Sequence, residues 1–186
     1  MRETELRIRL YGDAALRRKA RSIQAVSGRH RDILGRMLQL MQESSGIGLA
    51  APQVGISEAM IVVDIGQGPY KLINPKIAKR SGRQALEEGC LSVPEVCIKV
   101  KRAKEVWVEA LDEDGRPCTI KAEGLLACVL QHEIDHLRGK LIVDYASFFD
   151  RLKIRSKLAE LSRLAKGQRD DQGLRESKTK SCRLQL

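Results

Sequence analysis

Three segments of the chain carry apolar side chains every three to four residues, the spacing typical of amphipathic helices. They span residues 29–44, 123–137 and 148–166. The second predicted helix is followed by Gly139, and glycine commonly ends helices. In the third helix we expect the buried side to consist of Leu152, Ile154, Leu158, Leu161 and Ala165.

Four shorter segments have the length and composition of β-strands. Turn sequences separate them in pairs, Gly66-Gln67-Gly68-Pro69 in the first pair and Asp112-Glu113-Asp114-Gly115 in the second. Strands joined by such turns, with helices before, between and after them, favour an α+β fold over a parallel doubly wound sheet. The predicted strands are residues 59–64, 71–78, 104–111 and 116–122.

The composition is that of a globular protein with one domain. The chain has 186 residues, of which 42% are hydrophobic and 31% are charged. Its apolar runs are too short to span a bilayer, and its first residues lack the apolar stretch of a signal peptide. We therefore expect a cytoplasmic protein with no membrane partner. Residues 1–166 are expected to form the folded domain, and residues 167–186 a basic polar tail without stable structure.

Two short motifs carry the candidate chemistry. In His132-Glu133-Ile134-Asp135-His136 the two imidazoles lie one helical turn apart, so both can reach one metal ion. Cys90, in Glu88-Gly89-Cys90-Leu91-Ser92, can supply a thiolate as third ligand and leave one coordination position open. Glu133 is then placed to act as a general base.

Both motif histidines lie on the apolar side of their predicted helix, where they could instead be ordinary core residues. Because two of the three histidines of the chain fall in this motif, a metal site is the favoured interpretation. The fold class expected from the residues is α+β, with a C-terminal amphipathic helix.

Three other kinds of protein fit parts of this pattern. A zincin-type metallopeptidase needs a third ligand downstream of its histidines, where only Glu160 lies at a suitable distance. A copper electron carrier needs an axial methionine, and all four methionines lie upstream. The third is a ribosome- or RNA-binding module with an inactive pocket. Aromatic residues make up only 3% of the chain, which disfavours a base-stacking surface.

A further motif, Gly46-Ile47-Gly48-Leu49-Ala50-Ala51-Pro52-Gln53, combines small residues with one polar side chain. Its glycines allow the backbone to approach a ligand or a neighbouring strand closely. In this order and with this spacing, the three motifs resemble the signature motifs of peptide deformylases. The similarity also includes residues 10–16 and extends to about residue 165.

The resemblance implies an enzyme that removes the N-formyl group from the N-terminal formyl-methionine of newly synthesised proteins. The implied metal ligands are Cys90, His132 and His136, and Glu133 is the implied acid and base. The Gln53 side chain and the backbone N–H of Leu91 are implied to hold the carbonyl oxygen. The family fold implies antiparallel or mixed sheets packed around a central metal-binding helix. It also implies that the peptide lies as an added strand beside the glycine-rich motif. Ferrous iron is the implied metal, with zinc, nickel or cobalt as substitutes.

The methionine side chain of the substrate is expected to lie beside the metal. Leu125, Cys128 and Val129 precede His132 by one to two helical turns and are predicted to form one wall of its pocket. Val93 is predicted to face them and Ile47 to close the entrance. The other expected substrate contacts are Gly46, Gly48, Glu88 and Gly89.

The net charge of +10 is concentrated near the C-terminus, because residues 151–186 carry 11 Lys and Arg against 4 Asp and Glu. Formylated chains emerge from the ribosome, whose surface is rich in phosphate. The basic last helix and tail are therefore predicted to bind ribosomes, and a solvated basic surface is the alternative. The residues concerned are Arg151, Lys153, Arg155, Lys157, Arg163, Lys178, Lys180 and Arg183.

Overall fold

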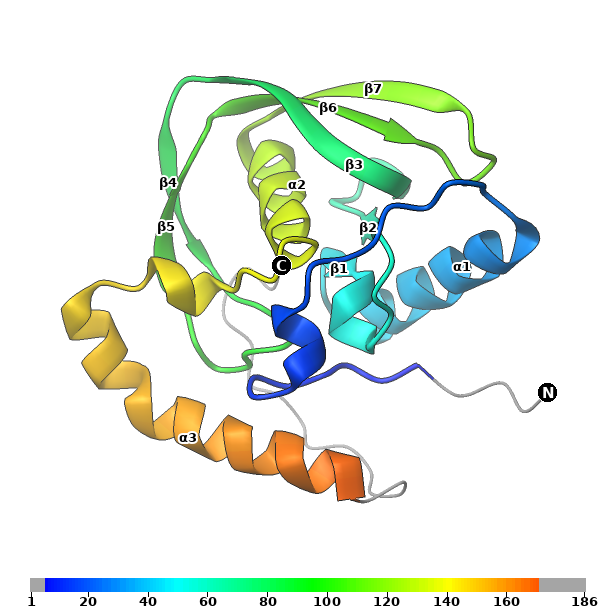
Figure 1. Cartoon of the computed structure of the whole chain (residues 1–186). Coiled ribbons are helices and arrows are strands. Elements are labelled where there is room, and N and C mark those ends of the chain that lie inside the picture. Colours follow the sequence, from blue (N-terminus) through cyan, green and yellow to red (C-terminus); the bar gives the residue numbers. More distant parts are fainter. Residues whose placement is uncertain (1–5, 171–186) are drawn as a thin grey trace.

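The computed structural model describes residues 6–170, with side chains described as far as Gly167. A five-stranded antiparallel sheet arches over one central helix (Figure 1). In spatial order its strands are β1 (Gly48–Ala50), β2 (Met60–Val63), β3 (Tyr70–Ser81), β6 (Glu105–Leu111) and β7 (Pro117–Glu123). A separate antiparallel pair joins β4 (Gln84–Glu88) to β5 (Ile98–Arg102). β1 is an edge strand, and no described strand pairs with its outer side.

The four predicted strands correspond to β2, β3, β6 and β7, whereas the sequence does not predict β1, β4 or β5. β1 is only three residues long, and it lies in a glycine- and alanine-rich segment of low strand propensity. In β5 the side chains of Ile98, Val100 and Arg102 are buried, while those of Lys99 and Lys101 are exposed. Strands are predicted from alternating apolar residues, and Arg102 interrupts this alternation at an inward position of β5.

Three helices complete the domain, within a few residues of their predicted bounds: α1 (Gly28–Glu43), α2 (Gly124–His136) and α3 (Phe148–Asp170). Short 3-10 helices are η1 (Ala14–Arg17), η2 (Ala51–Val54) and η3 (Ile142–Tyr145). α2 fills the concave side of the large sheet (Figure 1). Its Leu126, Leu130 and Ile134 share one buried cluster with Ile61 and Val108 of the sheet. The predicted α+β fold around a central helix is thus confirmed.

The end of α2 depends on Gly139, as predicted. This glycine has a φ of +73°, and a Cβ built on it would lie 2.5 Å from the carbonyl oxygen of Arg17. Only glycine fits both the left-handed backbone and the close approach of the N-terminal segment. The turn therefore fixes where the chain leaves the metal-binding helix.

α3 lies along the outside of the domain (Figure 1). Leu161 is buried in a cluster with Leu16 of η1 and Ile142 of η3, so this helix is docked on its own domain. The prediction that Leu152 belongs to the buried side is wrong, because 55% of this residue is exposed. α3 continues past Gly167 to Asp170. The remainder of the predicted tail, residues 171–186, lies outside the described residues.

None of the described helices combines the length and the apolar character needed to cross a membrane.

Candidate metal centre

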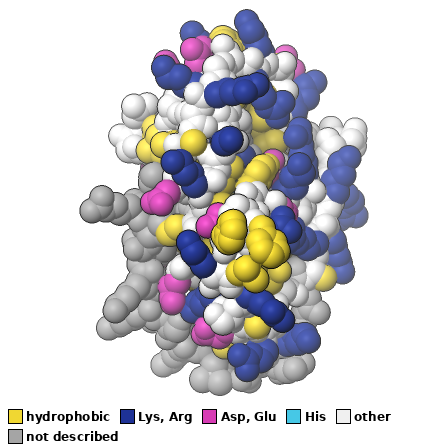
Figure 2. Space-filling view, turned by 90° about the vertical axis from the view of Figure 1, so that its left-hand side faces the viewer, with side chains coloured by type: hydrophobic (Ala, Val, Ile, Leu, Met, Phe, Trp, Pro, Cys, Tyr) yellow, Lys and Arg dark blue, Asp and Glu magenta, His cyan; other side chains and the backbone are white. Residues whose placement is uncertain are grey.

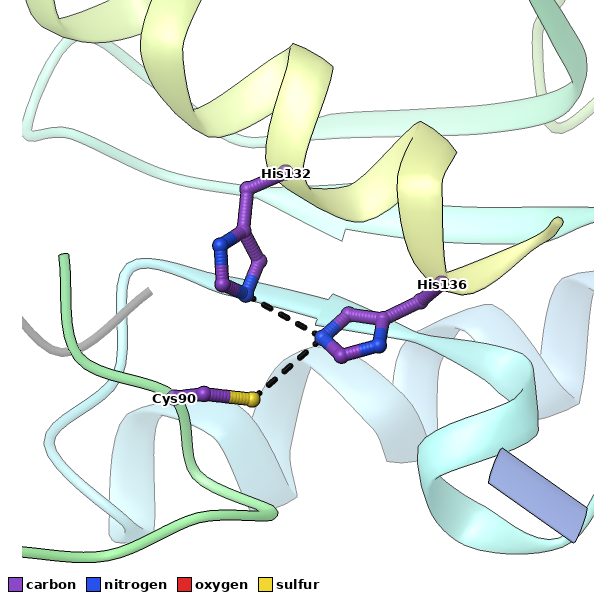
Figure 3. A group of neighbouring side chains, drawn as sticks. All are labelled: Cys90, His132 and His136. Atoms are coloured by element: carbon purple, nitrogen blue, oxygen red, sulfur yellow. Dashed lines mark hydrogen bonds between the residues drawn. The ribbon is translucent and has the colours of Figure 1, made fainter. Parts of the chain in front are cut away.

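Three side chains from two distant parts of the chain meet at one buried point (Figure 3). His132 and His136 project from α2, and Cys90 comes from the loop that follows β4. The Nε2 atoms of the two histidines are 3.1 Å apart, and Cys90 Sγ lies 3.3 Å from His136 Nε2. All three ligand atoms lie within 4.8 Å of one another. The structure thus brings together the three predicted ligands.

The two shorter separations, 3.1 and 3.3 Å, are close to those around a single tetrahedral ion. Metal–sulfur and metal–nitrogen bonds of roughly 2.3 and 2.0 Å place neighbouring ligand atoms about 3.3–3.6 Å apart. Burial, and next the nearby Glu133 charge, raise the pKa of the Cys90 thiol to about 12. Such a buried sulfur is held as a thiolate by a bound cation, as metal ligation requires. Burial also lowers the pKa of His136 well below its usual range, so the ring is neutral and can donate a lone pair.

His132 is held from behind by a buried charge network that the sequence does not predict. Its Nδ1 lies 2.9 Å from Glu88 Oε2, and Glu88 in turn accepts two hydrogen bonds from Arg102, at 2.6 and 2.8 Å. Arg102 also donates to Asp135 at 2.7 Å, and Asp135 accepts a further hydrogen bond from Tyr145. This arrangement fixes the ring orientation of His132, so that Nε2 faces the other two ligands.

The expectation that Glu88 contacts substrate does not fit this placement. Glu88 is fully buried, and both of its oxygens are engaged by Arg102 and His132. Burial opposes ionisation of this carboxyl, but hydrogen bonds from Arg102 and His132 outweigh it and lower its pKa to about 2. Glu88 is therefore an anion behind the metal centre. Arg102 could have been noticed in the sequence only as a charged residue at an inward strand position.

Glu133 stands beside the ligands with its carboxylate uncommitted. The residue is fully buried, yet neither carboxylate oxygen has a hydrogen-bond partner among the described residues. Burial raises its pKa well above the ordinary range; Arg102 opposes this, and the charges of Glu88 and Asp135 add to it. Such a group needs a partner from outside the chain, and it can accept a proton readily.

Two hydrogen-bond donors flank the same point. The side chain of Gln53 is buried, and its Oε1 accepts a hydrogen bond from Ala50 N at 2.7 Å. Its Nε2 therefore faces the site and lies 3.6 Å from Cys90 Sγ and 3.3 Å from Ser92 Oγ. The backbone N–H of Leu91 donates to no acceptor among the described residues. The Leu91 N–H can therefore donate to an added oxygen atom, and the Gln53 amide can do so by exchanging its hydrogen bonds to Cys90 and Ser92.

The predicted pocket residues fall into different places. A Cβ built on Gly48 would lie 2.9 Å from Val129 Cγ1, so these two residues meet beside Glu133, while Gly46 lies against Leu91. Ile47 and Leu125 are half-buried and pack against the cluster that contains Val129. Gly89, between Glu88 and Cys90, is buried.

Two further predicted pocket residues, Cys128 and Val93, have other contacts in the structure. The Cys128 thiol donates to Glu88 Oε1 at 3.1 Å, which turns it toward the rear of His132. Val93 packs in another cluster, with Cys90 and Val96. Their role as facing walls of the methionine pocket stays a prediction.

Comparison with known proteins identifies the family. The family model described as polypeptide deformylase matches residues 5–151. A peptide deformylase from Nitrosococcus oceani is 44% identical over 163 residues, which cover 86% of this chain and 98% of that protein. This chain belongs to the peptide deformylase family.

Solved structures of peptide deformylases agree with this assignment. The enzyme from Thermus thermophilus is 40% identical, with a TM-score of 0.81, and the match covers 85% of this chain and 98% of that one. The enzyme from Legionella pneumophila is also 40% identical, with a TM-score of 0.81 and coverage of 87% and 97%. A third deformylase, from Synechococcus elongatus in complex with actinonin, is 40% identical with a TM-score of 0.76, covering 89% and 88%.

The peptide deformylase described here is thus a metal-dependent amide hydrolase that removes the N-formyl group from nascent proteins. The alternative of a zincin peptidase fails at its third ligand. The sulfur of Cys90 is the third ligand atom beside the two histidines, whereas Glu160 lies on α3 and forms an ion pair with Lys157 at 3.3 Å. The copper carrier and the inactive binding module are excluded with it, because the family is one of hydrolases.

Proposed function

We propose that Glu133 is the catalytic acid and base, and that Gln53 and Leu91 hold the formyl oxygen. The observation that carries this proposal is the buried Glu133 carboxylate, which has no partner among the described residues and lies beside three converging ligand atoms. When bound by Cys90 and the two histidines, a divalent ion supplies Lewis acidity and lowers the pKa of a water molecule.

The remaining steps belong to side chains and backbone of this protein. Glu133 removes a proton from the attacking water and returns it to the departing amine nitrogen, so the carboxyl is restored in each turnover. Negative charge grows on the formyl oxygen during attack. The Gln53 Nε2 group, which lies beside Cys90 Sγ, and the Leu91 N–H, which has no acceptor among the described residues, stabilise that charge by donating hydrogen bonds to the oxygen.

The peptide is proposed to extend along the free edge of β1. This edge has no described strand partner, so its backbone is open to an approaching peptide, and Gly46 just before it leaves room for the Leu91 side chain. The substrate methionine then enters beside Val129, with Ile47 and Leu125 at the margin of its site. Gly48 and Gly89 contribute backbone only.

A set of four variants tests the roles of the metal-site side chains. Cys90→Ser, His132→Ala and His136→Ala are each expected to lose bound metal, because each removes one of three protein ligands. Glu133→Ala is expected to keep one metal ion per chain and to lose kcat by several orders of magnitude. Metal content and formate release are measured on the same samples. Retention of metal by all three ligand variants, or near-normal turnover by Glu133→Ala, contradicts the proposal.

Ferrous iron is the proposed native metal. A thiolate with two imidazoles suits Fe(II) as well as Zn(II), Ni(II) or Co(II). Both Fe(II) and a thiolate oxidise in air. The iron form is therefore expected to lose activity in air sooner than the nickel form of the same preparation. Equal lifetimes of the two forms contradict iron as the labile component.

We also propose that the enzyme works in the cytoplasm at the ribosome, which it contacts through the outer face of α3. Arg155 and Arg163 are exposed on this face. Because Leu161 docks α3 on the domain, charge reversal is a cleaner test than truncation. Arg155→Glu with Arg163→Glu is expected to weaken co-sedimentation with ribosomes in a salt-dependent way, while small formyl peptides are still hydrolysed. Unchanged co-sedimentation contradicts this contact.

The catalytic domain is proposed to comprise residues 1–166, with α3 as an integral part of it. Lys157 on α3 forms an ion pair with Glu95 at 3.0 Å, and Gly12 passes so close to α3 that a Cβ there would lie 2.8 Å from Ser162 Cα. These contacts attach α3 to the loop after the metal ligand Cys90 and to the N-terminal segment. The tail that follows has no assigned part in catalysis.

A further inference from the structure

The two phenylalanines of this protein are both at its surface. Phe148 and Phe149 occupy the first turn of α3 and are each 72% exposed. Their ring centroids are 5.8 Å apart and their planes are inclined by 78°. With Leu152, one turn further along, they form a protruding group that we call the aromatic tip. Figure 2 shows hydrophobic side chains gathered on this side of the molecule, with many Lys and Arg side chains around them. Burying one such ring stabilises a fold by about 1.5–3 kcal/mol, and the two exposed rings do not contribute this stabilisation.

A positively charged pocket of about 420 Å³ begins beside the aromatic tip. Arg151 and Arg155 of α3, Arg17 of η1 and Tyr11 line it together with Asp144. We call this the basic pocket. Asp144 neutralises Arg17 through hydrogen bonds of 2.6 and 3.0 Å. Arg151 donates only to backbone carbonyls, and Arg155 makes no hydrogen bond or ion pair with another described residue. The pocket therefore retains the charge of two guanidinium groups.

The tip and the pocket are neighbours on one helix. Arg151 follows Phe148 by three residues and Arg155 follows Arg151 by four, so the three side chains lie along one side of α3, one turn apart. A surface with open aromatic faces next to unpaired guanidinium groups matches a nucleotide, whose base stacks and whose phosphate is anionic. We infer that this surface binds unpaired RNA, with bases stacked on Phe148 and Phe149 and phosphate in the basic pocket.

Other occupants fit the same surface less well. Two copies of this chain would bring their basic pockets together, and like charges oppose that contact. A bilayer needs a longer apolar face than the single turn of α3 that the tip supplies. The low aromatic content predicted no base-stacking surface, but it describes the average of the chain. Both phenylalanines are adjacent in the sequence, and the structure leaves both rings exposed.

This inference rests in part on the proposed ribosome contact, since it names unpaired RNA as what α3 meets there. The test is therefore made away from the ribosome, by fluorescence anisotropy with a labelled single-stranded RNA of about ten nucleotides. The double variant Phe148→Leu with Phe149→Leu keeps the apolar area and removes the ring faces. We expect it to bind this RNA at least about 5-fold more weakly, since stacking contributes roughly 1–3 kcal/mol per base.

Two charge variants distinguish RNA binding in the basic pocket from general attraction of RNA to a positively charged protein. Arg155→Gln is expected to reduce the salt dependence of RNA binding by about one phosphate contact. Arg116→Gln removes one exposed charge at the turn between β6 and β7, remote from α3, and is expected to leave that dependence unchanged. Hydrolysis of a small formyl peptide serves as the folding control for all variants.

Three results would overturn the inference. They are equal RNA affinity of the double leucine variant and the unchanged protein, equal salt dependence of the two charge variants, and binding to anionic phosphatidylglycerol vesicles that exceeds binding to RNA. Ribosome co-sedimentation is scored separately. RNA binding that follows these variants while ribosomes are not bound supports the RNA surface and contradicts only the ribosome contact.

Discussion

At Gly48 the backbone of β1 passes directly against the Glu133 carboxylate. A Cβ built there would overlap Glu133 Oε1 and would lie 2.9 Å from Val129 Cγ1. Glycine thus allows β1 and α2 to approach as closely as the proposed roles require, with the peptide along β1 and Glu133 as acid and base.

Gly48→Ala is therefore expected to displace Glu133 while the metal remains bound. A misplacement of about 1 Å costs on the order of 100-fold in rate, so we expect kcat to fall by at least that factor. The matched control is Gly35→Ala, since Gly35 lies in α1 with nothing within 4 Å of its Cβ position. The control is expected to keep its activity and to gain up to about 1 kcal/mol of stability. A Gly48→Ala enzyme with normal kcat contradicts this account of the strand.

Glu88 gives a prediction for pH. Its pKa in the folded protein is about 2, below its ordinary value of 4.5, so the carboxylate stabilises the fold above pH 4.5. That stabilisation is lost as the pH falls from 4.5 to about 2. We expect the free energy of unfolding of the metal-free protein to exceed that of Glu88→Gln by on the order of 3 kcal/mol at neutral pH. The difference shrinks across this acid range, and a difference that is constant with pH contradicts the assignment.

The residues that could be predicted from the sequence are those whose roles follow from local spacing. His132 and His136 are one helical turn apart, so their convergence follows from helix geometry alone. Arg102 and Tyr145 could not be predicted, because their contacts with Glu88 and Asp135 depend on how β5 and η3 fold against α2. The hydrogen bond from the Cys128 thiol to Glu88 could not be predicted for a related reason: helix spacing gives the face on which Cys128 lies, but not which partner lies opposite.

Among the elements, the long helices and the hairpin strands were predictable because their apolar periodicity is complete. β4 and β5 were not, because their inward positions carry Glu88 and Arg102, which serve the metal site instead of the core. The start of α3 was predicted correctly, but the helix ends at Asp170 and not at Lys166, and its buried side does not include Leu152. Its first turn projects beyond the domain, and burial begins further along, near Leu161.

Alanine variants of two leucines test the difference in burial between the first turn of α3 and its later, docked part. Leu161→Ala is expected to lower the free energy of unfolding by about 2–5 kcal/mol, because the side chain is buried against η1 and η3. Leu152→Ala makes the same chemical change at a position that is 55% exposed, and is expected to change stability by less than about 0.5 kcal/mol. Chemical denaturation of both variants checks this. Similar losses for the two leucines contradict the docked position of α3.

In the whole molecule, three buried clusters meet at the metal centre, and each supplies part of it. The cluster between α2 and the large sheet positions both histidines, and the cluster beneath η1 and η3 contains Cys90. The third, around α1, contains Leu91 and lies behind β1. The reaction therefore depends on the packing of the entire domain, although its chemistry involves few side chains.

The most direct test of the central claim is formate release from a formyl-Met peptide, measured against the metal content of anaerobically prepared protein. We expect turnover to rise in proportion to bound divalent metal up to one ion per chain, to disappear on chelation, and to return when metal is restored. Full turnover by the metal-free protein, or no formate release from protein that holds one ion per chain, would contradict the claim that this Cys-His-His centre carries out deformylation.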